Sequence, residues 1–460
     1  MHTLLFHKKL SLCLLITLFC FSCKKFITVS PPDTAVTAAN VFSDDATATS
    51  AVMGIYTQVM GNTLFFMNGA TTLYPSLSSD ELSLTSPNPD LEGFADNALS
   101  PQSSILQNNL WGKAYQYIYQ MNACLQGLQG SSSLSPSVKE ELTGEVKFLR
   151  ATSYFYLANL FGAVPLELGT DYTVNAQMPR NSIAEIYAQI ITDLKDAETE
   201  LGENYLTPDL IRPNKFAAAA MLARVYLYMK DWADAETYAS EVINSGSYQL
   251  VTDPAGVFVS GSTETIWQMM PVLPGENTAE GLAFIPASPG TVPDYAVTSV
   301  LLNAFEPGDL RKSAWLDSTT VNGMTYYFPF KYKVRDGSDL TEYNIVLRLA
   351  EQYLIRAEAR AEQNNLTGAV ADINLIRERA GLSPLTAAIS QASCLAAVMQ
   401  ERRIELFAEW GHRWFDLKRT GMADAVLSVE KSGWKPSAAL YPIPYNEIQS
   451  NVRLTQNPGY

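Results

Sequence analysis

Histidine and positive charge are both scarce in this 460-residue chain. Only three histidines occur, and His2 and His7 lie in the first seven residues, which excludes a histidine-rich metal site. Lys and Arg number 32 against 47 Asp and Glu, so the net charge is −15. Such a protein does not attract nucleic acid or anionic lipid electrostatically. We therefore expect no nucleic-acid partner.

The apolar run near the N-terminus is too short to span a bilayer. Residues 10–21 are apolar and follow Lys8-Lys9, whereas a membrane-spanning helix needs about 20 apolar residues. This pattern is typical of a signal peptide. The run ends at Ser22-Cys23, which resembles the lipobox of bacterial lipoproteins. We predict a signal peptide over 1–22 and lipidation of Cys23; the alternative is an ordinary cleaved signal followed by an incidental cysteine.

Few cysteines remain after the signal. Cys124 and Cys394 both lie among apolar residues, so we expect small buried hydrophobic side chains; whether they pair is left open. An exported protein of this size without a disulfide framework depends on its hydrophobic core. Residues 23–39 contain Pro31-Pro32 and many small polar residues, which is typical of a tether.

Helical patterns dominate the rest of the chain. Ser135-Pro136 places an N-cap and an N1 proline before a long apolar-periodic run. Ser182 and Glu185 form the pattern of a capping box ahead of a segment whose apolar residues step by three and four. The sequence therefore predicts a mostly α-helical protein.

Two segments of the chain resemble each other. Ala223 is followed by Ala235 after twelve residues, and Ala357 is followed by Ala369 at the same spacing, each time across a short polar turn. Small residues at this spacing let two antiparallel helices pack closely, which is a degenerate tetratricopeptide signature. The alternative is two unrelated Ala-rich hairpins. Such pairs must stack, because one pair cannot cover its own apolar face.

Two segments have a less regular composition. Residues 248–341 contain many Pro and Gly and short β-prone stretches, and residues 62–101 are similarly irregular. We interpret 248–341 as a loop-and-strand insertion that crosses the helical scaffold. Long loops in a compact protein are usually functional.

Five blocks carry a family resemblance. Residues 402–421 read RRIELFAEWGHRWFDLKRTG and resemble the C-terminal helix signature of SusD/RagB proteins. The other blocks follow the family's order and read FLRATSYFYLANLFGAVPL from 148, RPNKFAAAAMLARVYLYMKDWADA from 212, LRLAEQYLIRAEA from 347, and YPIPYNEI and LTQNPGY at the end. The resemblance implies a single SusD-like body over 40–460. Its expected parts are a tetratricopeptide-like scaffold over 40–247 and 342–425, the insertion 248–341 and a C-terminal segment 426–460.

The resemblance also implies a function. Proteins of this family are outer-membrane lipoproteins that face the exterior, bind oligosaccharides or polysaccharides, and deliver them to a SusC-like TonB-dependent transporter. Residues 24–28 lack the acidic residues often found there, so retention on the inner leaflet stays open. Two other functions also stay open: a lipid-anchored scaffold that binds protein or peptide only, and a glycoside hydrolase.

The residues that suggest chemistry have structural explanations. Glu351 and Glu358 lie on a predicted helix with Arg348 and Arg356, where salt bridges are expected. His412 lies beside tryptophans and is interpreted as a packed core residue. The sequence contains no nucleophile elbow, phosphate loop or His-Glu-x-x-His motif. The stretch 88–92 lacks the spacing of a calcium loop, so calcium is not indicated, although its binding stays open. We predict no catalytic residue, metal or cofactor.

Sugar capture needs aromatic faces and polar groups instead. Trp315, Tyr326 and Tyr327 lie among polar residues and are the first candidates, whereas Trp267 and Phe328 are expected in the core. For each aromatic residue, anchoring of a loop in the core is the alternative. The predicted glycan-binding residues are Trp315, Tyr326, Tyr327, Asp80, Glu81, Tyr74, Phe94 and Tyr295.

Overall fold

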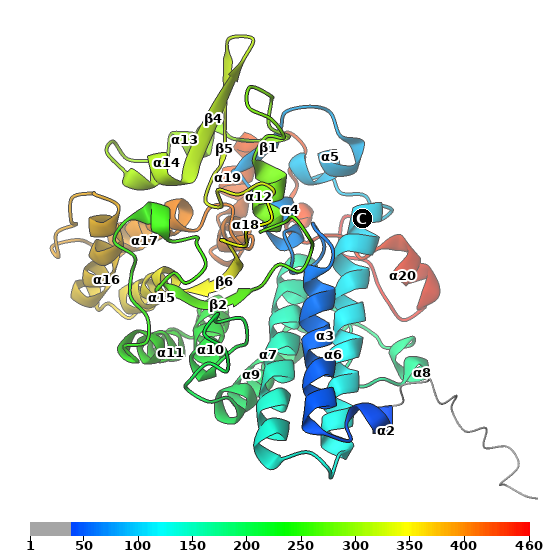
Figure 1. Cartoon of the computed structure of the whole chain (residues 1–460). Coiled ribbons are helices and arrows are strands. Elements are labelled where there is room, and N and C mark those ends of the chain that lie inside the picture. The colour runs from blue at the N-terminus through cyan, green and yellow to red at the C-terminus, as the bar shows by residue number, and fades with distance from the viewer. Residues whose placement is uncertain (1–37) are drawn as a thin grey trace, which may run out of the picture.

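The computed structural model describes residues 38–460, and helices make up most of it (Figure 1). The predicted signal peptide, Cys23 and the tether as far as residue 37 lie outside the described residues. Between residues 38 and 460, no helix is long and apolar enough to cross a membrane.

Long helices lie side by side at the N-terminal end of this body (Figure 1). They are α3 (Asp45–Met60), α6 (Gly112–Gly130), α7 (Pro136–Phe161) and α9 (Ile183–Glu200), preceded by the short α2 (Ala38–Val41). A π-helical turn over Leu106–Trp111 leads into α6, and α8 (Tyr172–Asn175) lies between α7 and α9.

The predicted helix starts are confirmed. Helix α7 begins at Pro136, although the Ser135 hydroxyl donates to Asp45 Oδ2 at 2.6 Å and does not cap the helix. Helix α9 begins with the predicted capping box: Ser182 Oγ accepts from the Glu185 N–H at 3.3 Å, and the Ser182 N–H donates to Glu185 Oε2 at 2.8 Å.

The repeated alanines mark two helix pairs. The pairs are α10 (Lys215–Met229) with α11 (Trp232–Asn244), and α15 (Leu349–Glu362) with α16 (Leu366–Arg379). Ala223, Ala235, Ala357 and Ala369 are all fully buried, because each lies where the helices of a pair meet or stack on a neighbour. The helices continue into α17 (Gln391–Glu405), so the prediction of stacked tetratricopeptide-like pairs is confirmed.

The segment between the helix pairs has the expected loop-and-strand character. Strand β2 (Thr265–Met269) pairs antiparallel with β6 (Asn344–Arg348), and β4 (Leu316–Val321) forms a hairpin with β5 (Met324–Pro329) that projects from the body (Figure 1). Short helices α12 (Ala279–Phe284), α13 (Ser299–Leu302) and α14 (Leu310–Trp315) lie between the strands.

Residues 62–101 are more regular than the sequence suggests. They contain α4 (Ala70–Ser78), β1 (Leu82–Leu84) and α5 (Pro89–Ala95), and β1 pairs antiparallel with β3 (Tyr295–Val297) of the insertion. The C-terminal part adds α18 (His412–Arg419), α19 (Ala423–Glu430) and α20 (Tyr445–Ser450). The two irregular segments therefore meet at one end of the molecule.

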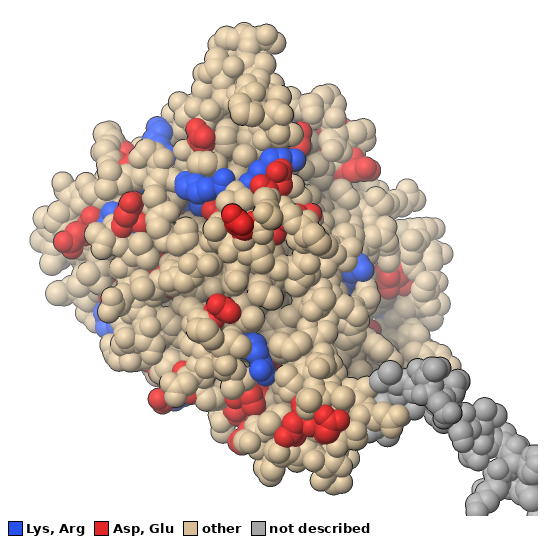
Figure 2. Space-filling view, in the orientation of Figure 1, with Lys and Arg blue, Asp and Glu red and all other residues tan. Residues whose placement is uncertain are grey.

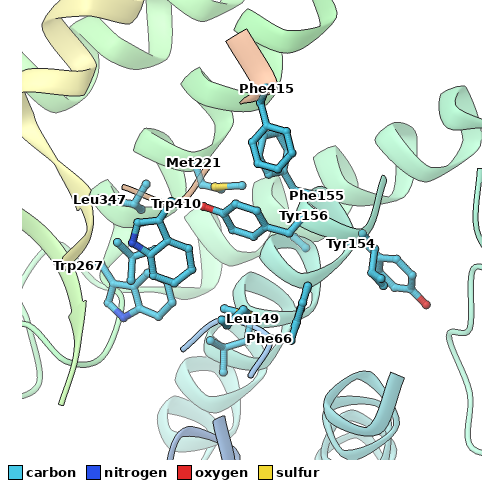
Figure 3. Packing of buried hydrophobic residues seen from close by; sticks show 14 of the residues in the cluster. Phe66, Leu149, Tyr154, Phe155, Tyr156, Met221, Trp267, Leu347, Trp410 and Phe415 are labelled. Atoms are coloured by element: carbon cyan, nitrogen blue, oxygen red, sulfur yellow. The ribbon is translucent and has the colours of Figure 1, made fainter. Parts of the chain in front are cut away.

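Aromatic residues join the insertion to the scaffold in the core (Figure 3). Trp267 of β2 meets Phe148 of α7 edge to face, with ring centroids 4.8 Å apart. Trp267 and Phe328 are buried, as predicted. Cys124 and Cys394 are buried free thiols, which answers the open question of pairing.

A buried charge network also joins these parts. Glu405 of α17 lies within salt-bridge distance of Arg311, Arg348 and Arg379, which come from α14, β6 and α16. Burial alone would raise the pKa of Glu405, but the three guanidinium groups outweigh it and hold this pKa well below its ordinary value. The carboxylate therefore stays ionised and connects three elements.

Candidate functional site

The predicted site pair Asp80 and Glu81 lies inside the protein. The Asp80 carboxylate accepts from Arg403 and Arg413 at 2.7 to 2.8 Å. Burial opposes ionisation of Asp80, yet the hydrogen bonds and charges of these arginines lower its pKa. Glu81 accepts from Ser76 Oγ at 2.8 Å, and burial raises its pKa to about 7. Asp80 therefore holds the 62–101 segment against α17 and α18, and Glu81 accepts from the Ala408 N–H at 3.3 Å. Both carboxyl groups lie in the core, which corrects the expectation that they face a ligand.

Tyr74 and Phe94 are also core residues. Their rings stack with centroids 4.7 Å apart and an interplanar angle of 20°. The hydroxyl of Tyr74 donates to Leu64 O at 3.3 Å and accepts from Asn109 Nδ2 at 3.2 Å. Because both faces of this pair are packed, neither ring can stack on a sugar.

The burial of Trp315 corrects the expectation that this residue binds the glycan. Its side chain is fully buried, and Nε1 donates to Pro254 O at 2.8 Å. The Lys331 ammonium lies 4.6 Å from its ring centroid. Tyr295 is buried as well and meets the Phe284 ring edge to face. These two aromatics anchor loops, the alternative that the sequence left open.

Tyr326 and Tyr327 are the predicted residues that stay partly exposed. They lie on β5 opposite Thr319 and Ser318, so their side chains point to opposite faces of the β4–β5 ribbon. The hairpin tip, Asn322-Gly323, has φ angles of 52° and 79°, which suit a two-residue turn of these residue types. The hairpin therefore presents one tyrosine on each face.

His412 has a structural role, as interpreted, and the two helical glutamates form salt bridges, although not with the expected Arg348 and Arg356. His412 is buried, and burial followed by the charge of Arg224 holds its pKa well below its ordinary value. Glu351 pairs with Arg224 at 2.6 Å, and Glu358 pairs with Arg419 at 2.5 Å. Among residues 38–460, no group of three or more His, Cys, Asp or Glu side chains is arranged to hold a metal ion.

An open groove of about 540 Å³ lies between the β1–α5 segment and the residues that end and follow α19. Its polar lining combines hydroxyls and charged groups from residues far apart in the chain: Ser83, Thr85, Ser86, Glu92, Asp96, Glu430, Lys431 and Ser432. We call it the β1–α5 groove.

The carboxylates of the β1–α5 groove face solvent, whereas its ammonium group is held. Glu92, Asp96 and Glu430 are exposed. The Lys431 ammonium donates to Leu77 O at 2.8 Å, and burial lowers its pKa to about 8. The groove therefore offers several hydrogen-bond acceptors and one positioned donor.

The two sides of the groove are fixed by a close backbone contact. A Cβ at Gly433 would come within 2.2 Å of Asp96 O, so only glycine fits. The next residue, Trp434, is half-buried; its ring meets Trp414 at 6.0 Å and its Nε1 donates to Asp424. Sequence reasoning missed this arrangement, and only the Trp434 residue type hinted at it.

A larger hollow lies elsewhere. A hollow of about 950 Å³ between α6 and α7 has no aromatic residue in its lining. Several of its charged groups are already paired: Arg150 binds Asp193 and Asn122, and Lys147 binds Glu200. On the face shown in Figure 2, charged side chains are scattered and form no continuous basic patch.

Comparison with known proteins places the chain in a family. Residues 304–460 match the model of the SusD family, and residues 76–227 match a family described as starch-binding associating with outer membrane. The chain belongs to the SusD/RagB family. A SusD-like protein of Formosa agariphila is 25% identical, over 96% of this chain and 97% of its own. The starch-binding protein SusD of Bacteroides thetaiotaomicron is 25% identical, over 69% of this chain and 72% of its own.

Solved structures agree with this SusD-like assignment. A SusD superfamily protein from Bacteroides vulgatus superposes with a TM-score of 0.80 at 21% identity, over 91% of this chain and 100% of its own. A laminarin-binding SusD-like protein superposes with a TM-score of 0.75 at 25% identity, over 91% and 100%. At 21% identity, the superposition with the Bacteroides vulgatus protein shows a shared fold.

Proposed function

We propose that this SusD-like protein binds oligosaccharides and delivers them, uncleaved, to a SusC-like TonB-dependent transporter. The observation that carries the proposal is the β1–α5 groove, where exposed carboxylates and hydroxyls from distant parts of the chain line one hollow. Family membership and the laminarin-binding structural neighbour support a carbohydrate ligand.

The groove has the chemistry that neutral sugars require. Glu92, Asp96 and Glu430 accept hydrogen bonds from sugar hydroxyls, and the ammonium of Lys431 donates one. We propose that the exposed part of Trp434, two residues after the lining residue Ser432, adds an apolar surface for the C–H groups of a pyranose ring. We propose Tyr326 and Tyr327, on the projecting hairpin, as a further contact with a longer chain.

Binding without cleavage fits the exposure of these carboxyl groups. A glycosidase needs two carboxyl groups roughly 5 to 10 Å apart, and burial raises the pKa of the one that acts as general acid. Glu92, Asp96 and Glu430 are all exposed. The groove therefore lacks the buried environment that would keep one of them protonated at neutral pH.

Delivery needs a fixed place at the membrane. We propose that the lipid on Cys23 holds the protein on the outer face of the outer membrane, with residues 24–37 as the connection to the body. A transporter beneath the protein would then receive the glycan. In this arrangement the protein contacts the glycan and the transporter, and neither contact involves the lipid.

Isothermal titration calorimetry of the chain from residue 24, with a panel of neutral oligosaccharides, tests the proposal. We expect saturable binding of at least one glycan, and chromatography of the same mixture should show no shortened product. Release of shortened sugars would support the hydrolase alternative, and binding of peptides alone would support the scaffold alternative.

A further inference from the structure

A second pocket lies on another part of the surface. It has a volume of about 420 Å³ and is bordered by α6, by residues 165–176 and by α20. It shares no lining residue with the β1–α5 groove. We call it the α6–α20 pocket.

Four aromatic residues line the α6–α20 pocket. The rings of Trp111 and Tyr115 lie 5.0 Å apart at an angle of 41°, and the Tyr115 hydroxyl donates to Pro165 O at 2.8 Å. Tyr119 and Tyr172 are 48% and 78% exposed, although both are large aromatic residues. The pocket therefore has exposed aromatic surface at Tyr119 and Tyr172, and the faces of aromatic rings carry partial negative charge.

Two carboxyl groups line the same pocket. Glu447 Oε1 accepts from Gln107 Nε2 at 2.7 Å. Within residues 38–460 the carboxyl group of Glu167 has no hydrogen-bond or salt-bridge partner, although its backbone oxygen accepts from Tyr154 at 2.8 Å. Burial, and then the charge of Glu447, raise the pKa of Glu167 to about 7. A cation bound in the pocket would therefore stabilise the ionised form of Glu167.

Several more deeply buried acids of the protein have a cationic partner. Asp193, Glu351 and Glu358 each form a salt bridge to an arginine. The lining of the α6–α20 pocket contains two glutamates and no Lys, Arg or His. Since like charges destabilise each other in a partly buried site, a positive ligand group in the pocket would favour the ionised form of both carboxyl groups.

We propose that the α6–α20 pocket binds the ammonium group of a small organic ligand. Glu167 and Glu447 neutralise its charge, and the aromatic side chains stack against its methyl or methylene groups. Cation–π attraction and charge-assisted hydrogen bonds both favour such a ligand over a neutral one. The α6–α20 pocket and the β1–α5 groove share no lining residue, so an experiment that disproves ligand binding at one site leaves the other site unaffected.

Choline and its neutral isostere, in which carbon replaces nitrogen, are the matched probes. Calorimetry on the chain from residue 24 should show saturable binding of choline and none of the isostere. Glu167→Gln and Tyr119→Ala should each weaken choline binding about tenfold or more. The controls Glu203→Gln and Tyr445→Ala change exposed residues outside the pocket and should bind like the unmodified protein.

The pH dependence gives a second readout. The charge of choline does not change with pH. If choline binding becomes tighter as the pH rises from about 6 to about 8, the change reports deprotonation of Glu167, and Glu167→Gln should remove this dependence.

Glucosamine oligomers and their N-acetylated forms then distinguish an amino sugar from a small quaternary amine. No binding of choline or glucosamine, equal binding of the neutral isostere, or unchanged binding by both pocket variants would overturn the proposal. Neutral-oligosaccharide binding in the β1–α5 groove should survive Glu167→Gln.

Discussion

Asp80 and Arg413 are 333 residues apart in the chain, yet their side chains form hydrogen bonds of 2.7 and 2.8 Å. Arg403 adds a third bond to the same carboxylate at 2.8 Å. Asp80 therefore fixes the segment before β1 to α17 and α18, and so holds one wall of the β1–α5 groove in place.

Removing the Asp80 charge should destabilise the protein. Asp80→Asn leaves two mostly buried guanidinium groups without a carboxylate, and breaking a buried pair in this way costs about 3 to 5 kcal/mol. The control Asp90→Asn changes an exposed residue of α5 and should cost less than about 1 kcal/mol. Urea unfolding followed by circular dichroism measures both. Normal stability with lost glycan binding would instead place Asp80 at the ligand.

Glu81 should make stability depend on pH. Its pKa in the folded protein is about 7, above the ordinary value of 4.5. The folded state therefore binds the proton more tightly, so the contribution of Glu81 to stability is full below pH 4.5 and is lost as the pH rises to about 7.

The variant Glu81→Gln isolates this effect because glutamine mimics the protonated acid. The difference in unfolding free energy between the unmodified protein and Glu81→Gln should change by on the order of 3 kcal/mol, in favour of the variant, between acidic and neutral pH. Unfolding series at both pH values measure it. A difference that does not vary with pH contradicts a protonated Glu81.

Trp315 should behave as a core residue. Trp315→Ala removes a fully buried side chain and the hydrogen bond to Pro254, so we expect a loss of about 3 to 5 kcal/mol. Tyr326→Ala, on the partly exposed hairpin, should cost less than about 1 kcal/mol. Chemical denaturation compares the two variants. Equal stability of both would contradict the packing around Trp315.

Local chemistry made much of this fold predictable. The Ser182–Glu185 capping box and the buried alanines at 223, 235, 357 and 369 lie where the sequence predicts them. These features depend on residues within one helix or one helix pair. The family resemblance supplied the order in which the pairs stack.

The candidate site was much less predictable. Polar neighbours in the sequence suggested an exposed Trp315, but its hydrogen-bond partner Pro254 is 61 residues away. Asp96 and Lys431 line one groove although they lie in different parts of the chain. Burial and groove formation depend on such long-range contacts, and one sequence does not show them.

Lipidation of Cys23 is tested in cells. Cys23→Ala should lose incorporation of a labelled fatty acid and membrane association, because the thiol is the proposed attachment point. Its fold, measured by circular dichroism on the purified protein, should not change. Cys124→Ala, a buried thiol, is the matched control and should keep the label. A label retained in Cys23→Ala contradicts the lipobox.

We propose the β1–α5 groove as the binding site of a neutral oligosaccharide. The most direct measurement is the calorimetric affinity of Asp96→Asn for the glycan that the unmodified protein binds, beside the exposed-residue control Glu203→Gln. Losing one charge-assisted hydrogen bond of about 1.5 to 3 kcal/mol should weaken binding about tenfold or more, with the unfolding midpoint unchanged. Full affinity in Asp96→Asn would contradict the groove as the glycan site.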